Sequence, residues 1–318
     1  MKSSQDPQLT FFDLSQANRT PKNKVLDMLN EFVDFTEVEA RIEATYSDRG
    51  RPGCRVGLLL RTMILQHLYG LSDPQAEEQL RDRLSFQKFV GLSGSEDVPD
   101  ETTICRFRNR LISCGLHEDL LEQLNQQLEE RGYIVKRTTL VDATLVESSR
   151  RRPMKEEVTE GTAPDKDASY VRKRGKTHYG YKAHVSADGE HHLIRRAIMT
   201  TANVDDGHMM REVSPEDSEE LYADKAYDSK SNKKWLAEHG IENRILKKGA
   251  HHIKLTEEDR EQNERLGKVR KEIERIFAHM KQWQGYRRVR YRGLAKNQLE
   301  LTLKAVAYNL RRMVTLAS

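Results

Sequence analysis

The spacing of apolar residues changes near the middle of the chain. From Lys22 to about residue 131, apolar side chains recur every three or four positions, which predicts a series of amphipathic helices joined by short polar turns. The clearest is an apolar helix from Val56 to Tyr69 that Gly70 ends, and Ser72 is the expected N-cap of the next helix. The first part of the chain is therefore expected to be helical.

This helical block has two interpretations. Short capped helices that follow one another across turns of a few residues are typical of helix-turn-helix DNA-binding proteins. A bundle of this kind is at least as often a dimerisation or packing module. We expect a helical DNA-binding or dimerisation domain over residues 21–135, in which Thr102 or Thr103 caps one helix, after a flexible polar arm over residues 1–20.

The second part has short apolar runs that are typical of strands. The first run, Thr138–Glu147, is β-branched and apolar, with one carboxylate, Asp142, in its middle. An Asp-Gly pair within residues 186–189 predicts a hairpin turn. The other expected elements are, in order, a charged loop over 150–175, strands over 177–185, 192–200 and 220–227, a helix capped by Ser229, a strand over 241–246, and long helices over 257–284 and 297–313. This order predicts an α/β, ribonuclease-H-like domain over residues 136–318, with a mixed five-stranded sheet and flanking helices.

Composition narrows the class of protein. Of the 318 residues, 36% are hydrophobic and 33% are charged, which leaves enough apolar residues for a core and suits two domains. The net charge of +4, from 54 basic and 50 acidic residues, does not by itself indicate a nucleic-acid binder. The distribution of charge along the chain is therefore more informative than its sum.

Several sequence signals bear on compartment and chemistry. Three cysteines without a CxxC pair are typical of a reduced, cytosolic protein. The N-terminus has no apolar run of the signal-peptide kind, and the most apolar run, Leu58 to Tyr69, is too short to span a bilayer. We therefore expect a soluble, cytoplasmic protein. The sequence has no GxxxxGK loop and no GxSxG elbow, so ATP use and acyl chemistry are not indicated.

Three acids are candidates for a metal site. Asp142 in its apolar strand is costly unless it is paired or coordinates a metal, and the strand alone leaves open a plain pairing with a neighbouring Arg. Asp224 ends the fourth strand and Glu274 lies in the long helix, and the expected fold allows all three carboxylates to converge. Hard ions such as Mg²⁺ take oxygen ligands, and two of them support phosphodiester chemistry.

The helix around Glu274 adds two cations. Arg270 precedes Glu274 by four residues and Lys281 follows it by seven, so all three lie close to one face. Such a face suits a carboxylate on a metal with cations on phosphates. It equally suits an ordinary solvated face with an ion pair between Arg270 and Glu274. The expected core face of this helix is Val269, Ile273, Ile276, Phe277 and Met280.

Basic residues form three clusters close in sequence to these acidic elements. The first is Lys281, Arg287, Arg288, Arg290, Arg292 and Lys296, interleaved with Trp283, Tyr286 and Tyr291. The second is Arg244, Lys247, Lys248, His251, His252 and Lys254, and the third is Arg150, Arg151, Arg152 and Lys155. Each alone is typical of a plain surface, but together they favour contact with phosphates, supported by aromatic rings in the first cluster.

Short motifs across nearly the whole chain resemble those of bacterial insertion-sequence DDE transposases, specifically the group named for insertion sequence five. They are Arg49 to Pro52, Leu65 to Asp73, Pro99 to Ile104 with Arg106 to Arg108, Leu140 to Thr144, Gly180 to His184, Thr201 to Val204, Ala223 to Asp228, the Arg270, Glu274, Lys281 pattern, and Tyr291 to Leu294. One departure is Gly267, where the wider superfamily often has a tyrosine.

The resemblance implies a function and a set of partners. Asp142, Asp224 and Glu274 would be the catalytic metal ligands for two Mg²⁺ ions, with Mn²⁺ able to substitute, and Arg270 and Lys281 would grip the backbone of the transposon end. A homodimer would bind the terminal inverted repeats through the helical domain and basic loops, cleave at the ends, and join the 3′ hydroxyls to target DNA. Such an enzyme works in the bacterial cytoplasm and lies on the nucleoid when it is bound to DNA.

Two other classes of protein fit parts of this pattern. A catalytically silent, sequence-specific DNA-binding protein of transposase descent would share the domains, although the intact set of three acids disfavours it. A stand-alone nuclease of the same fold, such as a junction resolvase, is usually smaller and lacks the long helical domain.

Overall fold

The computed structural model describes residues 22–46, 53–94, 96–116, 119–173, 175–249 and 254–317. The expected arm over residues 1–20, the Arg49 to Pro52 motif, and His251 and His252 lie outside the described residues. The chain forms two compact units, one of residues 1–127 with 306–318 and the other of residues 128–305. The expected bounds were 21–135 and 136–318. The main difference is that residues 306–318, the end of the last helix, belong to the helical unit.

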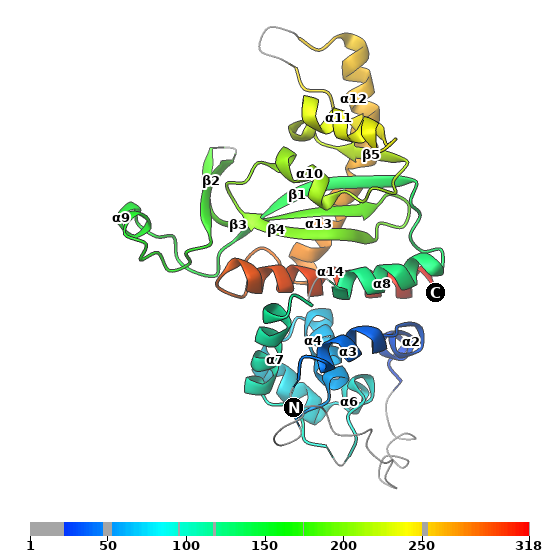
Figure 1. Cartoon of the computed structure of the whole chain (residues 1–318), viewed down its shortest axis with the longest axis vertical. Coiled ribbons are helices and arrows are strands. Elements are labelled where there is room, and N and C mark those ends of the chain that lie inside the picture. Colours follow the sequence, from blue (N-terminus) through cyan, green and yellow to red (C-terminus); the bar gives the residue numbers. More distant parts are fainter. Residues whose placement is uncertain are drawn as a thin grey trace. The chain divides into compact units, whose positions relative to one another are not determined.

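The helical unit follows the predicted pattern closely. Its helices are α2 (Lys24–Phe32), α3 (Thr36–Glu43), α4 (Val56–Tyr69), α5 (Asp73–Asp82), α6 (Leu84–Val90), α7 (Glu101–Ser113) and most of α8 (Asp119–Glu130) (Figure 1). Helix α4 ends at Gly70, whose φ of 72° suits glycine. The side chain of Ser72 accepts a hydrogen bond from the backbone of Gln75 in a reciprocal capping box.

One predicted cap was wrong. The N-cap of α7 is Asp100, not Thr102 or Thr103, because the Asp100 carboxylate accepts the backbone N–H of Thr103 at 2.6 Å. Asp and Thr both serve as N-caps, and here the acid one turn earlier occupies the position.

The other unit is built on a mixed sheet, and its described part contains six strands instead of the expected five. They are β1 (Thr138–Glu147), β2 (Ser169–Lys173), β3 (Lys176–Asp188), β4 (Ile194–Thr201), β5 (Glu220–Ala223) and β6 (Glu242–Ile245). The order is β2-β3-β1-β5-β6, with β4 also paired to β3. Strand β1 pairs antiparallel with β3 and parallel with β5, so it lies at the centre of the sheet.

Two expectations about the strands need correction. The range 150–175, expected as a loop, contains a short helix α9 (Lys155–Thr159) and strand β2, which forms by pairing with β3. The predicted hairpin turn lies later than expected, because β3 continues to Asp188. The buried Asp188 carboxylate accepts the backbone N–H groups of Val135, Glu190 and His191, and these bonds place the turn after the strand.

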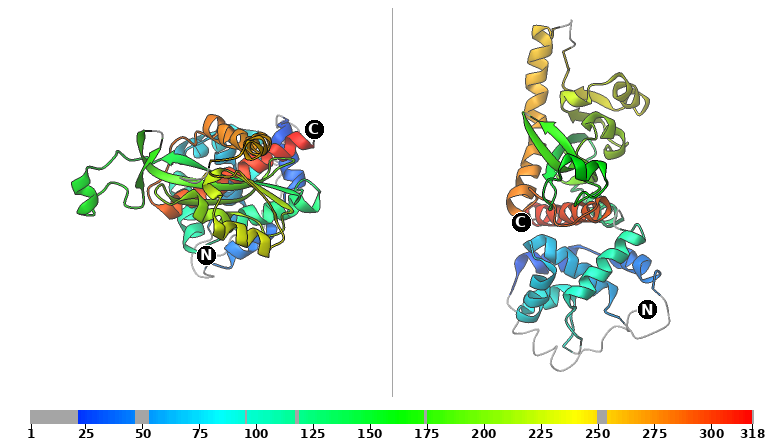
Figure 2. Two further views of the ribbon diagram at one scale, coloured as in Figure 1. Left: turned by 90° about the horizontal axis from the view of Figure 1, so that it is seen from above. Right: turned by 90° about the vertical axis from the view of Figure 1, so that its left-hand side faces the viewer.

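Helices cover both faces of the sheet. On one face lie the 3₁₀ turns η1 (Asp206–Met209) and η2 (Lys225–Tyr227) with α10 (Met210–Val213) and α11 (Lys230–Glu238). Residues of η2, α10 and α11 share an apolar cluster with β1, β5 and β6. On the other lie α12 (Glu257–Arg270) and α13 (Glu272–Trp283), as the right-hand view of Figure 2 shows. The last helix is α14 (Leu294–Leu316), whose second half belongs to the helical unit, where Arg311 donates to the backbone oxygen of Leu68.

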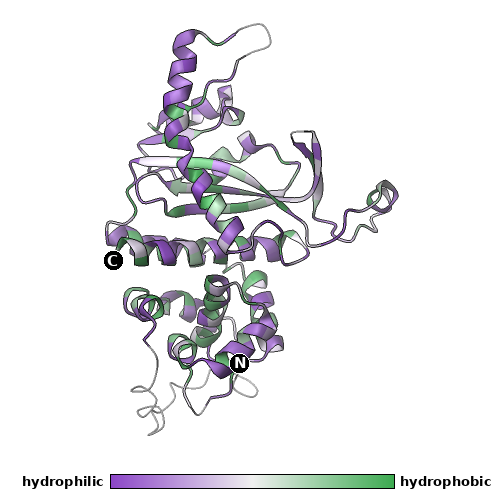
Figure 3. Ribbon diagram, turned by 180° about the vertical axis from the view of Figure 1, so that it is seen from behind, coloured by the Kyte–Doolittle hydropathy of each residue, from purple (hydrophilic) through white to green (hydrophobic). Residues whose placement is uncertain are grey.

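The long helix expected over 257–284 is two helices that meet at Lys271. Helix α12 is hydrophilic over most of its length (Figure 3), whereas α13 buries Ile273, Ile276, Phe277 and Met280 as predicted. Val269 was wrongly placed on this core face, because it lies before the break and is 38% exposed. None of the described helices is both long and apolar enough to cross a membrane.

Candidate active site

Asp142 and Asp224 lie at equivalent positions on neighbouring parallel strands. Val141 of β1 pairs in register with Ala223 of β5, and each acid is the next residue. Strand β1 continues to residue 147, so Asp142 lies within a strand. Strand β5 ends at Ala223, earlier than predicted, and Asp224 becomes the N-cap of η2, where its carboxylate accepts the N–H of Lys225 at 2.7 Å. The parallel pairing therefore brings two carboxylates together although 82 residues (224 − 142) separate them in sequence.

The carboxyl group of Asp142 is hydrogen-bonded through both oxygens and has a raised pKa. One oxygen accepts the N–H of Ala143 at 2.8 Å and the other accepts from the guanidinium of Arg270 at 2.8 Å. Burial raises the pKa of Asp142 from 3.8 to about 6, the Arg270 cation opposes this rise, and Asp224 adds to it. The site therefore favours a bound cation whenever Asp142 is ionised.

Arg270 joins Asp142 to the third acid. Its guanidinium also donates to Glu274 at 2.6 Å, across the break between α12 and α13 at Lys271. The ion pair that the sequence left open is thus present, and the same arginine reaches the central strand. In the described part of the chain, no three His, Cys, Asp or Glu side chains form a group that could hold a metal ion. The structure brings two of the acids together directly and the third through Arg270.

Lys281 lies beside the acids, as the helical spacing suggested. Its ammonium donates to the hydroxyl of Thr144, which is two residues after Asp142 and therefore on the same face of β1. Burial lowers the pKa of Lys281, Arg287 and Lys173 lower it further, and Asp142 opposes them. Cations from three separate segments therefore surround one edge of the acid pair.

Lys173 was missed by the sequence analysis. It lies at the exposed end of β2, within the range expected as a loop, and its charge also acts to lower the pKa of Asp142. Tyr170 and Val171, two good strand formers in an otherwise charged stretch, were the available signal.

The first basic cluster is anchored at the end of β1. The backbone oxygen of Arg287 accepts from Glu147 at 3.0 Å, and the N–H of Val289 donates to Glu147 at 2.9 Å. The guanidinium of Arg288 lies 3.8 Å from the Glu147 carboxylate. The segment after α13 thus continues the sheet locally, which holds Arg288 beside Glu147 and Arg287 close enough to lower the pKa of Lys281.

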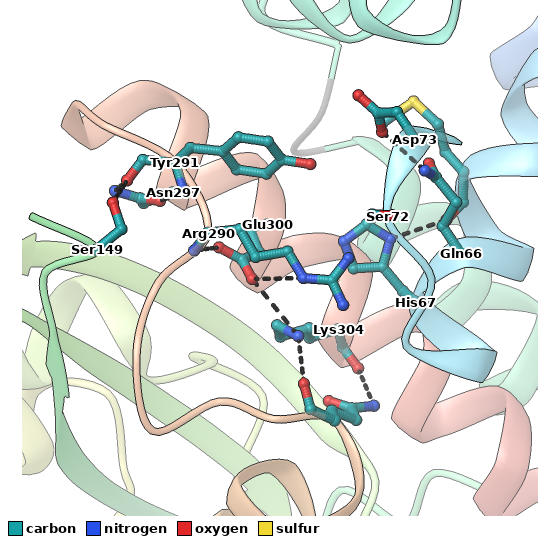
Figure 4. Close-up of polar contacts among 12 residues, drawn as sticks. Gln66, His67, Ser72, Asp73, Ser149, Arg290, Tyr291, Asn297, Glu300 and Lys304 are labelled. Atoms are coloured by element: carbon teal, nitrogen blue, oxygen red, sulfur yellow. Dashed lines mark hydrogen bonds and ion pairs between the residues drawn. The ribbon is translucent and has the colours of Figure 1, made fainter. Parts of the chain in front are cut away.

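Arg290 has a different environment from its neighbours. Figure 4 shows Glu300 of α14 between Arg290 and Lys304, with its carboxylate 3.8 Å from the first side chain and 3.5 Å from the second. Glu300 is 1% exposed, and burial lowers the pKa of Lys304 to about 8. Tyr286 is also fully buried, against Lys304, so the prediction that its ring supports nucleic-acid contact was wrong.

The remaining predicted DNA-contact residues are dispersed. Lys247 forms an ion pair with Asp259 at 2.6 Å, and Arg151 forms one with Glu157. In Figure 1, α9, near Arg151, and the start of α12, near Lys247, lie at different extremities of their unit. The other members of the predicted set are exposed: Arg150, Lys248, Arg292 and Lys296. The second and third basic clusters thus do not merge into one surface, and their contact with DNA stays a prediction.

Two family models and a solved structure match this chain. The family described as transposase domain (DUF772) matches residues 14–110, and the family described as transposase DDE domain matches residues 134–310, more than half of the chain. Among solved structures, the chain is similar to the cryo-EM structure of piggyBac transposase synaptic complex with hairpin DNA. The identity is 10%, the match covers 95% of this chain and 74% of that chain, and the TM-score is 0.43.

The second family match contains all three acids and the helices that carry Arg270 and Lys281. Its members use divalent metal ions to cleave DNA and transfer strands. The DUF772 match in front of a DDE domain is the arrangement typical of insertion-sequence DDE transposases. The chain belongs to the transposase DDE domain family and is a DNA transposase.

Proposed function

We propose that this transposase binds the terminal inverted repeats of its own insertion sequence, cleaves at the ends, and joins them to target DNA with two Mg²⁺ ions. The observation that carries the proposal is the juxtaposition of Asp142 and Asp224 on parallel strands, with Glu274 connected to Asp142 through Arg270.

The donor set fits the implied ions. Asp142, Asp224 and Glu274 offer carboxylate oxygens, which Mg²⁺ prefers, and Mn²⁺ accepts the same ligands. The Arg270 guanidinium already supplies positive charge to Asp142 and Glu274, so these oxygens face a place where a cation is stabilised. We propose these three acids as the metal ligands.

The reaction has two phosphodiester steps. In the first, a water oxygen bonds to phosphorus, the bond to the transposon 3′ oxygen breaks, and that oxygen takes a proton. In the second, the new 3′ hydroxyl bonds to a target phosphorus and a target 3′ oxygen leaves. When bound, two divalent ions lower the barrier by activating the attacking oxygen and stabilising the leaving one.

The residues of the chain contribute position and charge. The central strand holds Asp142 rigidly, and Lys281 lies beside it with Arg287 and Lys173 close by. This cationic group is suited to the phosphate next to the scissile bond, since Lys and Arg neutralise backbone phosphates. We further propose that a homodimer acts on paired ends, which light scattering of the protein with and without end DNA tests.

The decisive experiment incubates the protein with linear DNA that carries the ends of its own element, in Mg²⁺ or in EDTA. We expect nicks at the ends only with the metal, and none with Asp142→Ala, Asp224→Ala or Glu274→Ala, while all three variants still bind the ends. Glu238→Ala, at an exposed position of α11, is the control and should cut like the wild type. Cutting at the wild-type rate by all three acid variants would remove the site assignment.

The same experiment separates the alternative function. A catalytically silent DNA-binding protein of transposase descent would shift end DNA specifically yet leave it intact in Mg²⁺ and in Mn²⁺.

A further inference from the structure

The turn that follows Asp224 is tied to a second turn by one buried side chain. Asn232 of α11 is 4% exposed, and its amide nitrogen donates to the backbone oxygens of Gly207 and Tyr227, both at 3.0 Å. Tyr227 ends the short 3₁₀ turn η2 that Asp224 caps. A single amide thus connects η1 to the turn that begins with Asp224.

The two turns are also in direct backbone contact at Gly207. A Cβ atom at this position would lie 2.7 Å from the backbone oxygen of Ala226, closer than real side chains approach. The φ of Gly207 is ordinary, so glycine is needed here for the close approach and not for the backbone conformation. Any larger residue would have to move the turn after Asp224 or η1 itself.

A largely buried ion pair anchors η1 to the sheet. Lys182 of β3 is 8% exposed, and its ammonium lies 2.7 Å from the Asp206 carboxylate and donates to the backbone oxygen of Val204. Lys182 points to the face of the sheet opposite Asp142, because the register pairs Asp142 with Val185, an odd number of residues away. Strand β3 therefore holds η1 on the face of the sheet opposite Asp142.

His184 lies on the same face of β3 as Lys182 but does not add a second positive charge beside Asp206. Burial lowers the pKa of His184, Asp206 opposes this and Lys182 adds to it, and the resulting pKa is about 4. The imidazole is therefore neutral near pH 7, and its Nε2 lies 2.9 Å from the Thr200 hydroxyl. No third charge from His184 therefore enters the Lys182–Asp206 pair. The motif over residues 180–184 supplies Lys182, and the motif over residues 201–204 supplies the Val204 backbone oxygen that Lys182 binds.

Asp224 needs external support in a way that Asp142 does not. Asp142 lies within a ten-residue strand whose pairing with β3 continues before and after it, whereas Asp224 follows a strand of four residues and starts a turn. A ligand must be held within about 0.5 Å of its productive position to bind a metal well. The position of Asp224 therefore depends on what holds η2.

We propose that Lys182, Gly207 and Asn232 form a brace that sets the position of Asp224 beside Asp142 and thereby the affinity of the site for metal. They are positioning residues, since they act through η1 and η2. The inference rests on the proposed role of Asp224 as a metal ligand, and it adds residues on the far face of the sheet to that site.

The test measures Mn²⁺ binding to the full chain by electron paramagnetic resonance of the free ion. Asn232→Asp replaces the donor with a carboxylate that faces two carbonyl oxygens, and Gly207→Ala pushes on Ala226. We expect each to raise the dissociation constant about 10- to 100-fold, as removal of an outer-shell partner does. End cleavage should return as Mn²⁺ is raised, because the ligands themselves remain.

The matched control is Asn297→Asp. Asn297 is also fully buried and makes two backbone hydrogen bonds, at 3.1 and 3.3 Å, but both are to Tyr291. We expect it to lower the free energy of unfolding while the Mn²⁺ dissociation constant of the folded protein stays at the wild-type value. A shift in affinity equal to that of Asn232→Asp would mean that general loosening is the cause, and would overturn the brace.

The outcomes distinguish the brace from the proposed function. If Asp224→Asn abolishes Mn²⁺ binding while Asn232→Asp and Gly207→Ala bind like the wild type, the brace is wrong and the metal site stands. If Asp224→Asn binds Mn²⁺ as tightly as the wild type, Asp224 is not a metal ligand, and both the proposed site and the brace are wrong. Where Asn232→Asp does not fold, Gly207→Ala and Lys182→Gln carry the same comparison.

Discussion

Asp142→Asn removes a charge that the folded protein holds at a cost. The carboxyl side chain is 17% exposed, and burial raises its pKa from 3.8 to about 6 even with Arg270 beside it. Asparagine keeps the shape of the side chain, and its oxygen can still accept the N–H of Ala143. The substitution therefore removes the charge with little change in packing.

The pH dependence follows from the direction of the pKa shift. Because the folded pKa lies above the unfolded one, the folded state binds the proton more tightly, and stability falls as the pH rises from about 4 to about 6. Two pKa units correspond to about 3 kcal/mol at about 1.4 kcal/mol per unit. Without metal, we expect Asp142→Asn to exceed the wild type in free energy of unfolding by up to about 3 kcal/mol at pH 8, and to match it near pH 4.

Urea denaturation in EDTA measures this difference. Trp235 and Trp283 are the two tryptophans of the chain and both belong to the unit of residues 128–305, so their fluorescence follows that unit alone. Asp259→Asn is the control of opposite sign, since Lys247 lowers the pKa of Asp259 and the charged form is stabilising there. A variant less stable than the wild type at pH 8, or a difference that is the same at pH 4 and pH 8, would refute the reasoning.

Three further results are expected. Arg270→Gln should bind Mn²⁺ about 30-fold more tightly at pH 8 by electron paramagnetic resonance, because a unit charge a few ångströms from a solvated site is worth about 1 kcal/mol against each of the two charges of the ion; unchanged or weaker binding would contradict the view that this cation competes with the metal at Asp142. Lys281→Ala should weaken end binding and reduce its salt slope by about one unit if it contacts one phosphate, and an unchanged slope in a filter-binding titration would exclude that contact. Glu300→Ala should lower the free energy of unfolding by about 3–5 kcal/mol, because it leaves Lys304 buried without its carboxylate; a loss below 1 kcal/mol in urea would show that the network contributes little.

Local patterns were sufficient for most elements of the fold. The bounds of α4 and β1 match their predictions, because an apolar run and its flanking turn residues are both local in sequence. Strand β2 was missed because its sequence, with Arg172 and Lys173, is not that of a buried strand, and it forms only by pairing with β3. The break at Lys271 was missed because neither Lys271 nor the residues next to it are proline or glycine.

By itself the sequence was sufficient to propose Asp142, Asp224 and Glu274 with Arg270 and Lys281 as the site, because motif spacing and residue chemistry are properties of the chain. It also determined that an apolar strand holds Asp142 and that Arg270, Glu274 and Lys281 lie in helical segments. Only the tertiary structure decided that Arg270 binds Asp142 and Glu274 at once, that Lys173 lies near them, and that the turn after Asp224 rests on Asn232. These contacts join segments up to 128 residues apart, so strand register and helix packing decide them and local spacing does not.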